Sequence, residues 1–255
     1  MKKKTEVRRM FVLDGGSFIY ETGMMIFGMD MDKRQRICTP FYAFDTEEGW
    51  FLYDTGWSPS VLPLLVQLGM APEIGEENNA VNQLKKIGVA PSDISSIILS
   101  HLHADHAGGL SFLPNATVYV QKDEYMYAFH PNSFQSLAYI QDAYNSPDIK
   151  WEILEGDQNI ISGLTVFLAS GHTPGLQGLL VELPESGFYI LGADSAYLDV
   201  NIEKNIPPGS SWNPVLAQYA IKRFKAFQAV LDAQYFPGHD LEFFEKNVKY
   251  ATEYR

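Results

Sequence analysis

Metal-binding side chains gather in one short stretch of the chain. Residues 101–106 contain four of them: His101, His103, Asp105 and His106. The apolar run Ile97-Ile98-Leu99 comes directly before, so the stretch begins where a buried strand is expected to end. On an extended backbone His101 and His103 project to the same side, and the Asp-His pair lies past a bend. Burying three imidazoles and a carboxylate at one turn is costly unless a cation neutralises them, so the stretch predicts a metal site.

Three further candidate ligands stand just past the ends of apolar runs, beside glycine or proline: His172, Asp194 and His239. Taken alone, His172 or His239 would more often be a buried structural histidine than a ligand. Functional sites in α/β sheets gather at the carboxyl ends of strands, so we expect these side chains to converge on residues 101–106. A catalytic zinc needs only three protein ligands, and this number of candidates therefore indicates two metal ions. His130 lies outside the pattern and is interpreted as a surface or structural residue.

Short apolar runs alternate with helical patterns along the whole chain, which is typical of an α/β layered protein. No linker-like tract interrupts residues 1–255, so we expect one domain. The predicted strands are Met10–Leu13, Phe41–Phe44, Trp50–Tyr53, Ser96–Leu99, Thr117–Val120, Leu164–Ala169, Leu179–Leu183, Phe188–Leu191 and Ala233–Phe236. Apolar stripes at helical spacing predict helices at Glu76–Ile87, ended by Gly88, and at Val215–Leu231.

Composition excludes several functions. Hydrophobic residues make up 46% of the 255 residues, enough for a packed core. The net charge of −12 should repel phosphate backbones and anionic membranes, so nucleic acid and membrane surfaces are poor candidate partners. No apolar run approaches the length of a membrane span. The basic start Met1-Lys2-Lys3-Lys4 is not followed by an apolar segment, so we expect no export signal.

A single cysteine, Cys38, cannot form an internal disulfide or a thiolate metal cage. We interpret it as a small buried apolar residue. One free thiol fits a reducing, cytoplasmic setting.

The segment Gly23–Arg36 is rich in methionine and has no clean period. Two interpretations stay open: a segment that covers the core, or a flexible apolar wall of a substrate pocket, since methionine adapts its shape to ligands. Candidates for such a wall are Met24, Met25, Phe27 and Trp57.

The residues described so far resemble those of the metallo-β-lactamase superfamily. Its motifs match in order from Asp54-Thr55-Gly56 to Gly238-His239-Asp240, nearly the whole chain. Within the superfamily the chain is most similar to the N-acyl-homoserine lactone lactonases, which quench quorum-sensing signals. Ser100–Gly109 looks like their signature, and Asp194-Ser195-Ala196-Tyr197 matches their placement of a tyrosine three residues after the bridging aspartate. The resemblance implies an αββα sandwich and a hydrolase that opens an acyl lactone with a hydroxide held between two metals.

The resemblance also implies a role for each site residue. His101, His103 and His172 would hold one divalent metal ion. Asp105, His106 and His239 would hold the other, and Asp194 would bridge both. Zinc is the expected metal, with iron, manganese and cobalt as alternatives. Monomers and homodimers both remain open.

Three positions near the ligands have expected roles beyond metal binding. Tyr197 would polarise the substrate carbonyl, and Asp105 would also hydrogen-bond the water or shuttle its proton. Asp54 would support a ligand rather than act as one. Position 104 departs from the pattern, because Ala104 stands where some lactonases carry a bulky aromatic residue, and this would widen the pocket.

Other functions in the same superfamily fit less well. Thioester hydrolases of the glyoxalase type add a helical C-terminal region, whereas 16 residues (240–255) follow His239 here. Zinc β-lactamases often use a cysteine ligand where Asp194 stands, and flavodiiron-like proteins carry a glutamate at the place of His103. Nuclease relatives need a basic groove to bind the phosphate backbone, whereas the net charge of this chain is −12. A phosphotriesterase side activity and a non-catalytic metal- or ligand-binding role stay open.

Overall fold

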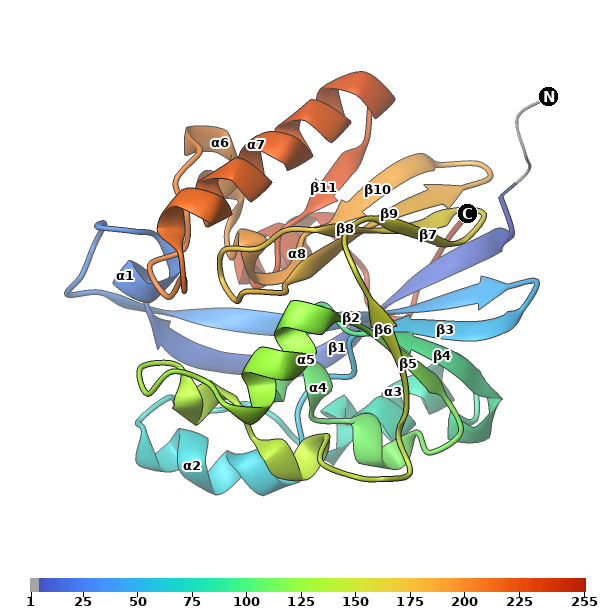
Figure 1. Ribbon diagram of the computed structural model, residues 1–255, viewed down its shortest axis with the longest axis horizontal. Coiled ribbons are helices and arrows are strands. Elements are labelled where there is room, and N and C mark those ends of the chain that lie inside the picture. Colours follow the sequence, from blue (N-terminus) through green and yellow to red (C-terminus); the bar gives the residue numbers. More distant parts are fainter. Residues whose placement is uncertain (1–4) are drawn as a thin grey trace.

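Two β-sheets stacked face to face form the centre of the computed structural model, which describes residues 5–255 (Figure 1). The larger sheet contains β1 (Val7–Glu21), β2 (Arg34–Thr46), β3 (Gly49–Tyr53), β4 (Ile94–Ile98), β5 (Thr117–Gln121), β6 (Lys150–Leu154) and β12 (Glu253–Tyr254), in the spatial order β12-β1-β2-β3-β4-β5-β6. The smaller sheet contains β7 (Gln158–Ile161), β8 (Leu164–Leu168), β9 (Gln177–Leu183), β10 (Gly187–Leu191) and β11 (Gln234–Phe236), in the order β11-β10-β9-β8-β7. Residues 1–4, the basic start at which no export signal was expected, lie outside the described residues.

Helices cover the outer faces of both sheets. Their bounds are α1 (Thr22–Met25), α2 (Leu62–Gln67), α3 (Ala80–Lys86), α4 (Ala104–Ala107), α5 (Lys122–Phe129), α6 (Asp199–Lys204), α7 (Pro214–Leu231) and α8 (Leu241–Asn247). Figure 1 shows α6 and α7 above the smaller sheet, and α2, α3 and α4 on the far side of the larger one. The predicted αββα sandwich is confirmed.

The central strands are apolar on both faces because each sheet lies between two packed layers. In β1, Met10 and Val12 face the other sheet, whereas Phe11 and Leu13 face the helices outside. All four side chains are buried. Since successive side chains on a strand point to opposite faces, this two-sided burial produces the continuous apolar runs from which the strands were predicted. Each of the nine predicted strands is present, with ends shifted by a few residues and with β1 and β2 considerably longer than expected.

The prediction missed the strands β6, β7 and β12. All three lie at sheet edges, where only one neighbour and part of one face need to be covered. Three of the five residues of β6 are exposed, so this strand has no apolar run. The predicted helix Glu76–Ile87 is also divided: a short 3-10 turn, Glu76–Asn78, comes first. The side chain of Asn79 then accepts a hydrogen bond from the Asn82 amide and starts α3 as its N-cap.

Strand direction brings the ends of five strands to one edge of the sandwich. In the larger sheet β3 pairs with β4 in parallel. In the smaller sheet β10 pairs with β11 in parallel, and β9 runs antiparallel to both β8 and β10. Therefore β8, β10 and β11 all point the same way. Every predicted ligand follows the carboxyl end of β4, β8, β10 or β11, and Asp54 follows β3.

Two expectations from composition are met by the described residues. Cys38 is buried and free. Among the helices of residues 5–255, none is long and apolar enough to cross a bilayer.

Candidate metal centre

All seven predicted ligands lie together at this edge. Their ligand atoms form two sets, each lying within 4.8 Å: His101, His103, His172 with Asp194, and Asp105, His106 with His239. We call the three histidines of the first set the first group, and the three residues of the second set the second group. Each member is buried except Asp105, whose side chain is 14% exposed.

Asp194 stands between the two groups and faces both. Its Oδ2 lies 3.3 Å from His172 Nε2 and 3.9 Å from His101 Nε2. Its Oδ1 lies 3.0 Å from His106 Nε2 and 2.8 Å from His239 Nε2. One carboxylate therefore presents one oxygen to each group, which is the arrangement that a bridging ligand requires.

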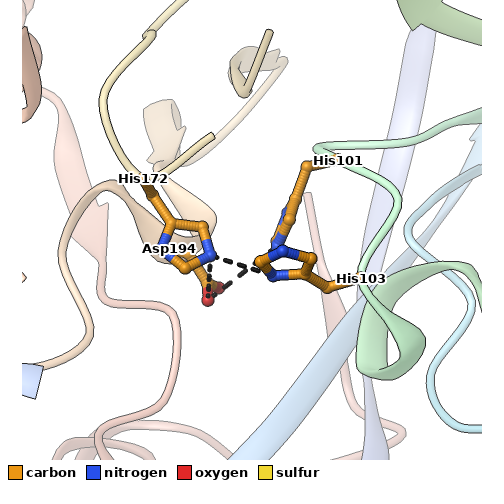
Figure 2. Close-up of side chains that lie close together, drawn as sticks. All are labelled: His101, His103, His172 and Asp194. Atoms are coloured by element: carbon orange, nitrogen blue, oxygen red, sulfur yellow. Dashed lines mark hydrogen bonds and ion pairs between the residues drawn. The ribbon is translucent and has the colours of Figure 1, made fainter. Parts of the chain in front are cut away.

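The donor set fits a pair of cations. Across the gap from His101 and His103, the side chains of His172 and Asp194 point toward the same centre (Figure 2). The ring nitrogens His172 Nε2 and His103 Nδ1 lie 3.0 Å apart. The buried Nε2 atoms of His101 and His103 have no hydrogen-bond partner. Unpaired buried nitrogens are costly, and imidazole nitrogens with carboxylate oxygens are common ligands of zinc and related metals.

Asp54 orients the second group from behind, in agreement with what the family resemblance implied. Its Oδ2 lies 2.8 Å from His106 Nδ1 and accepts a hydrogen bond of 2.8 Å from the Ser100 hydroxyl. Its Oδ1 accepts the Ser100 amide at 2.7 Å. A carboxylate at Nδ1 fixes the tautomer, so that Nε2 of His106 is left as a lone-pair donor toward the metal position.

His239 is held by the backbone of β2 from far away in sequence. Its Nδ1 lies 2.7 Å from the carbonyl oxygen of Cys38, and the Cys38 amide donates to the His239 carbonyl oxygen at 3.2 Å. The carbonyl can only accept, so Nδ1 carries a proton, and Nε2 is the ring nitrogen that faces Asp194 and would be the one to bind a metal. Cys38 thus contributes to the site through its backbone. Its thiol is buried in the core between the sheets.

The loop that carries His172 packs closely against its neighbours. The carbonyl oxygen of His172 accepts from Gln135 Nε2 at 2.9 Å and from the Trp212 amide at 3.0 Å. At Gly171, a Cβ atom would lie 2.3 Å from the backbone of Ala217 on α7. Only glycine fits at such an approach, which explains the Gly171-His172 sequence.

Sequence reasoning missed the side chains that surround the first group. Gln135, Tyr139 and Glu124 are buried polar residues from the segment between β5 and β6, and the ring of Tyr139 packs edge-on against His103 with centroids 4.5 Å apart. None of them belongs to a motif. His130, in contrast, is exposed and lies outside the site, as the sequence predicted.

Burial and local charge make the two groups electrostatically different. Burial lowers the pKa of His101 and His103 well below the usual 6.5 and lowers the pKa of His172 to about 4. Burial alone would also lower the pKa of His106, but the carboxylates of Asp105, Asp194 and Asp54 outweigh it and raise this pKa well above 6.5. The pKa of His239 is likewise raised, against burial, mainly by Asp194. Neutral imidazole is the form that binds a metal.

The site forms the floor of a cavity of about 370 Å³. The polar end is lined by His103, Asp105, His172, Asp194, Tyr197 and Ser210. The other walls are largely apolar and come from β1, from α2 with the residues on either side of it, and from the segment around residue 137; they include Phe18, Trp57, Val61, Leu65, Leu68, Met70 and Leu137. A molecule with a polar head and an apolar tail would match this division.

The methionine-rich segment contributes less to this cavity than expected. Met24 and Trp57 line it, as predicted. Met25 does not, because its side chain is fully buried in the core, and Phe27 is 53% exposed and outside the lining. The segment therefore both covers the core and supplies part of one wall.

A family model described as the metallo-β-lactamase superfamily matches residues 39–215, well over half of the chain. The chain belongs to this superfamily. The matched range contains six of the seven candidate ligands, and His239 follows it.

Curated relatives within the superfamily are N-acyl homoserine lactonases. The lactonase AiiA of Bacillus thuringiensis subsp. kurstaki is 31% identical over 97% of this chain and 99% of its own. The lactonase AttM of Rhizobium radiobacter is 34% identical over 72% of each chain. A solved structure of an N-acyl homoserine lactone hydrolase, with the product N-hexanoyl-L-homoserine at its catalytic metal centre, matches with a TM-score of 0.88 at 29% identity, over 97% of this chain and 99% of that one.

The electrostatic difference between the groups predicts stepwise metal loss on acidification. Protons compete with a metal for His106 and His239 at a higher pH, because the pKa of both is raised. Protons compete for the first group only at a lower pH, because burial lowers the pKa of its three histidines. We expect the metal-to-protein ratio, measured after equilibration with metal-free buffers of falling pH, to pass through a step at one ion per chain. Simultaneous loss of both ions, or earlier loss from the first group, would contradict this reasoning.

Proposed function

We propose that this chain is a metal-dependent hydrolase that opens the lactone ring of N-acyl homoserine lactones. The observation that carries the proposal is the position of Asp194, whose two oxygens face two histidine-containing groups at the floor of a cavity with one polar end. The names of the relatives AiiA and AttM support lactones as the substrate class.

In this proposal the first group holds one divalent ion, the second group holds the other, and Asp194 contacts both. We propose zinc, which suits nitrogen and carboxylate ligands; iron, manganese and cobalt accept the same donors. We also propose a cytoplasmic location, because the one cysteine, Cys38, is a buried free thiol.

Bound in these positions, two metal ions would supply a nucleophile from water at neutral pH and polarise an ester carbonyl. Side chains of the protein would then transfer the proton and stabilise the developing charge. Asp105 faces the cavity and lies 3.5 Å from His106 Nε2. Its pKa is raised, by burial first and then by Asp194, against the histidines. In our proposal Asp105 takes the proton of the attacking water and delivers it to the ring oxygen, as the bond between that oxygen and the carbonyl carbon breaks.

Tyr197 is the proposed hydrogen-bond donor to the carbonyl oxygen. Its ring packs against His239 with centroids 4.8 Å apart, and its side chain lines the polar end of the cavity. Burial, together with the charge of Asp194, raises its pKa well above 10, so the hydroxyl keeps its proton at neutral pH. A donor aimed at the oxygen where negative charge develops stabilises the transition state more than the substrate.

The proposed activity is tested with one metal-replete sample and a panel of substrates. We expect N-acyl homoserine lactones to be opened, measured as acid release, with kcat/KM on the order of 10⁴ M⁻¹ s⁻¹ or more. His101→Ala should lose metal and activity. The matched control His130→Ala changes an exposed histidine outside the site and should lose neither. A sample with two ions per chain that opens no lactone of any chain length, yet cleaves a thioester or a phosphotriester, would refute the substrate class.

Tyr197→Phe tests the donor. The variant keeps the ring that packs on His239 and removes only the hydroxyl, so metal content should hold while kcat falls by about a hundredfold, the low end for loss of one such donor. Tyr20→Phe is the control, because Tyr20 also lines the cavity and stacks on Tyr197 with centroids 6.4 Å apart. Its rate should stay close to that of the wild type. An unchanged rate for Tyr197→Phe would remove the hydroxyl from the mechanism.

Ala104→Phe tests whether the apolar walls bind the acyl chain. Ala104 lines the cavity and packs in the same cluster as Trp57, Val61 and Leu65. A phenylalanine there would fill space that a long chain needs, so kcat/KM should fall about fourfold for each methylene displaced. Short-chain lactones serve as the internal control and should be little affected. Equal loss for all chain lengths would mean that the chain lies elsewhere.

A further inference from the structure

Glu124 is a buried carboxylate with no place in the proposed mechanism. It belongs to α5, its side chain is fully buried, and it does not line the cavity. Burying a carboxylate is costly unless its oxygens are fully hydrogen-bonded. Its position next to the first group therefore calls for a reason beyond filling space.

The two oxygens of Glu124 bind different segments of the chain. Oε1 accepts the Leu102 amide at 3.0 Å and the Tyr139 hydroxyl at 2.9 Å. Oε2 accepts the Thr173 hydroxyl at 2.5 Å. The Gly175 amide is a further donor to this carboxylate.

Three of these four donors are immediate neighbours of the first group. Leu102 stands between His101 and His103, and Thr173 directly follows His172. The third donor, Tyr139, is the residue whose ring packs edge-on against His103. One side chain thus connects the loop after β4 with the loop after β8, although 49 residues separate Glu124 from Thr173.

The loop after β8 packs so closely against α5 that it has little room to move. A Cβ atom at Gly175 would lie 2.1 Å from the backbone nitrogen of Glu124. Glycine at this position lets the loop reach the helix, and the carboxylate then fixes it there. Burial raises the pKa of Glu124, while its hydrogen bonds oppose that rise.

We propose that Glu124 is a positioning residue for the first group: its carboxylate clamps the two loops that carry the three histidines at the separation that one metal ion needs. The inference rests on the metal centre proposed above and is independent of the lactone substrate. The effect acts through the backbone of Leu102 and the side chain of Thr173. Groups that orient metal ligands commonly contribute 10- to 100-fold to metal affinity.

Glu124→Gln is the direct test, because the amide keeps the shape of the carboxylate. A glutamine has one acceptor oxygen and one NH₂ group, so it can accept from the Leu102 side or from the Thr173 side but not from both. Zinc-loaded protein is mixed with a chromogenic chelator, and the release of each ion is followed in time without any substrate. We expect one of the two ions to leave about 10- to 100-fold faster than in the wild type.

Gln83→Ala is the matched stability control. Gln83 is also fully buried and hydrogen-bonded to two segments, but its partners are the Asp14 amide and the Glu77 carbonyl and not the ligand loops. Thermal unfolding is measured for both variants. Faster zinc release from Glu124→Gln at a loss of melting temperature no larger than that of Gln83→Ala supports the clamp.

A second pair of variants keeps the proposal testable if Glu124→Gln folds poorly. Thr173→Val removes one donor to the clamp, and Thr173→Ser keeps it. We expect faster release of one ion from the valine variant and near wild-type release from the serine variant. Wild-type release from Glu124→Gln, release that only matches that of Gln83→Ala, or equal release from both Thr173 variants would overturn the inference. A wild-type protein that holds two zinc ions but opens no lactone would refute the proposed substrate and leave the clamp in place.

Discussion

The buried carboxylate of Asp194 is the constraint on which the site depends. It is 1% exposed and lies among four histidines from the segments after β4, β8 and β11. The histidines lower its pKa well below the usual value, against the effect of burial. The neighbouring carboxylates of Asp54 and Asp105 add negative charge, while several imidazole nitrogens have no partner. Divalent cations would satisfy the carboxylates and the nitrogens at once, whereas neither protons nor hydrogen bonds within the chain can do both.

The fold meets this constraint by directing five strands toward one edge. Because β8, β10 and β11 run the same way, the loops after them can face the turn after β4 across the gap between the sheets. The geometry requires unusual backbone at two points beside the ligands. Asp54 has φ of 61° and Ala193 has φ of 43°, both in the left-handed region. Each such residue costs about 1 kcal/mol or more, and strain of this kind typically persists at functional sites.

The sequence predicted the clustering of the candidate ligands and the central strands for the same physical reason: both leave local patterns. A strand buried on two faces is a continuous apolar run, and His101 to His106 is a dense cluster. Edge strands such as β6 lack a local signal because they are mostly exposed. The residues that hold the ligands lack one because their partners are distant: Cys38 meets His239 across 201 residues. Asp54 was placed correctly only through family resemblance, and Glu124 has no comparable motif.

The two candidate metal positions differ because each takes a different pair of side chains from the turn after β4. The first group takes His101 and His103 from extended backbone, and its third member is again a histidine, so the group is neutral and Asp194 is its one carboxylate. The second group takes Asp105 and His106 from the first turn of α4 and has Asp54 behind it. Its surroundings are therefore more anionic, as the raised pKa of His106 shows. The side chains that hold the two groups in place also differ. The carboxylate of Asp54 contacts His106 directly, whereas the carboxylate of Glu124 acts on the first group only through neighbouring backbone and hydroxyl groups. The first position therefore depends on loops that are held in place, and the second on a carboxylate that contacts its histidine directly.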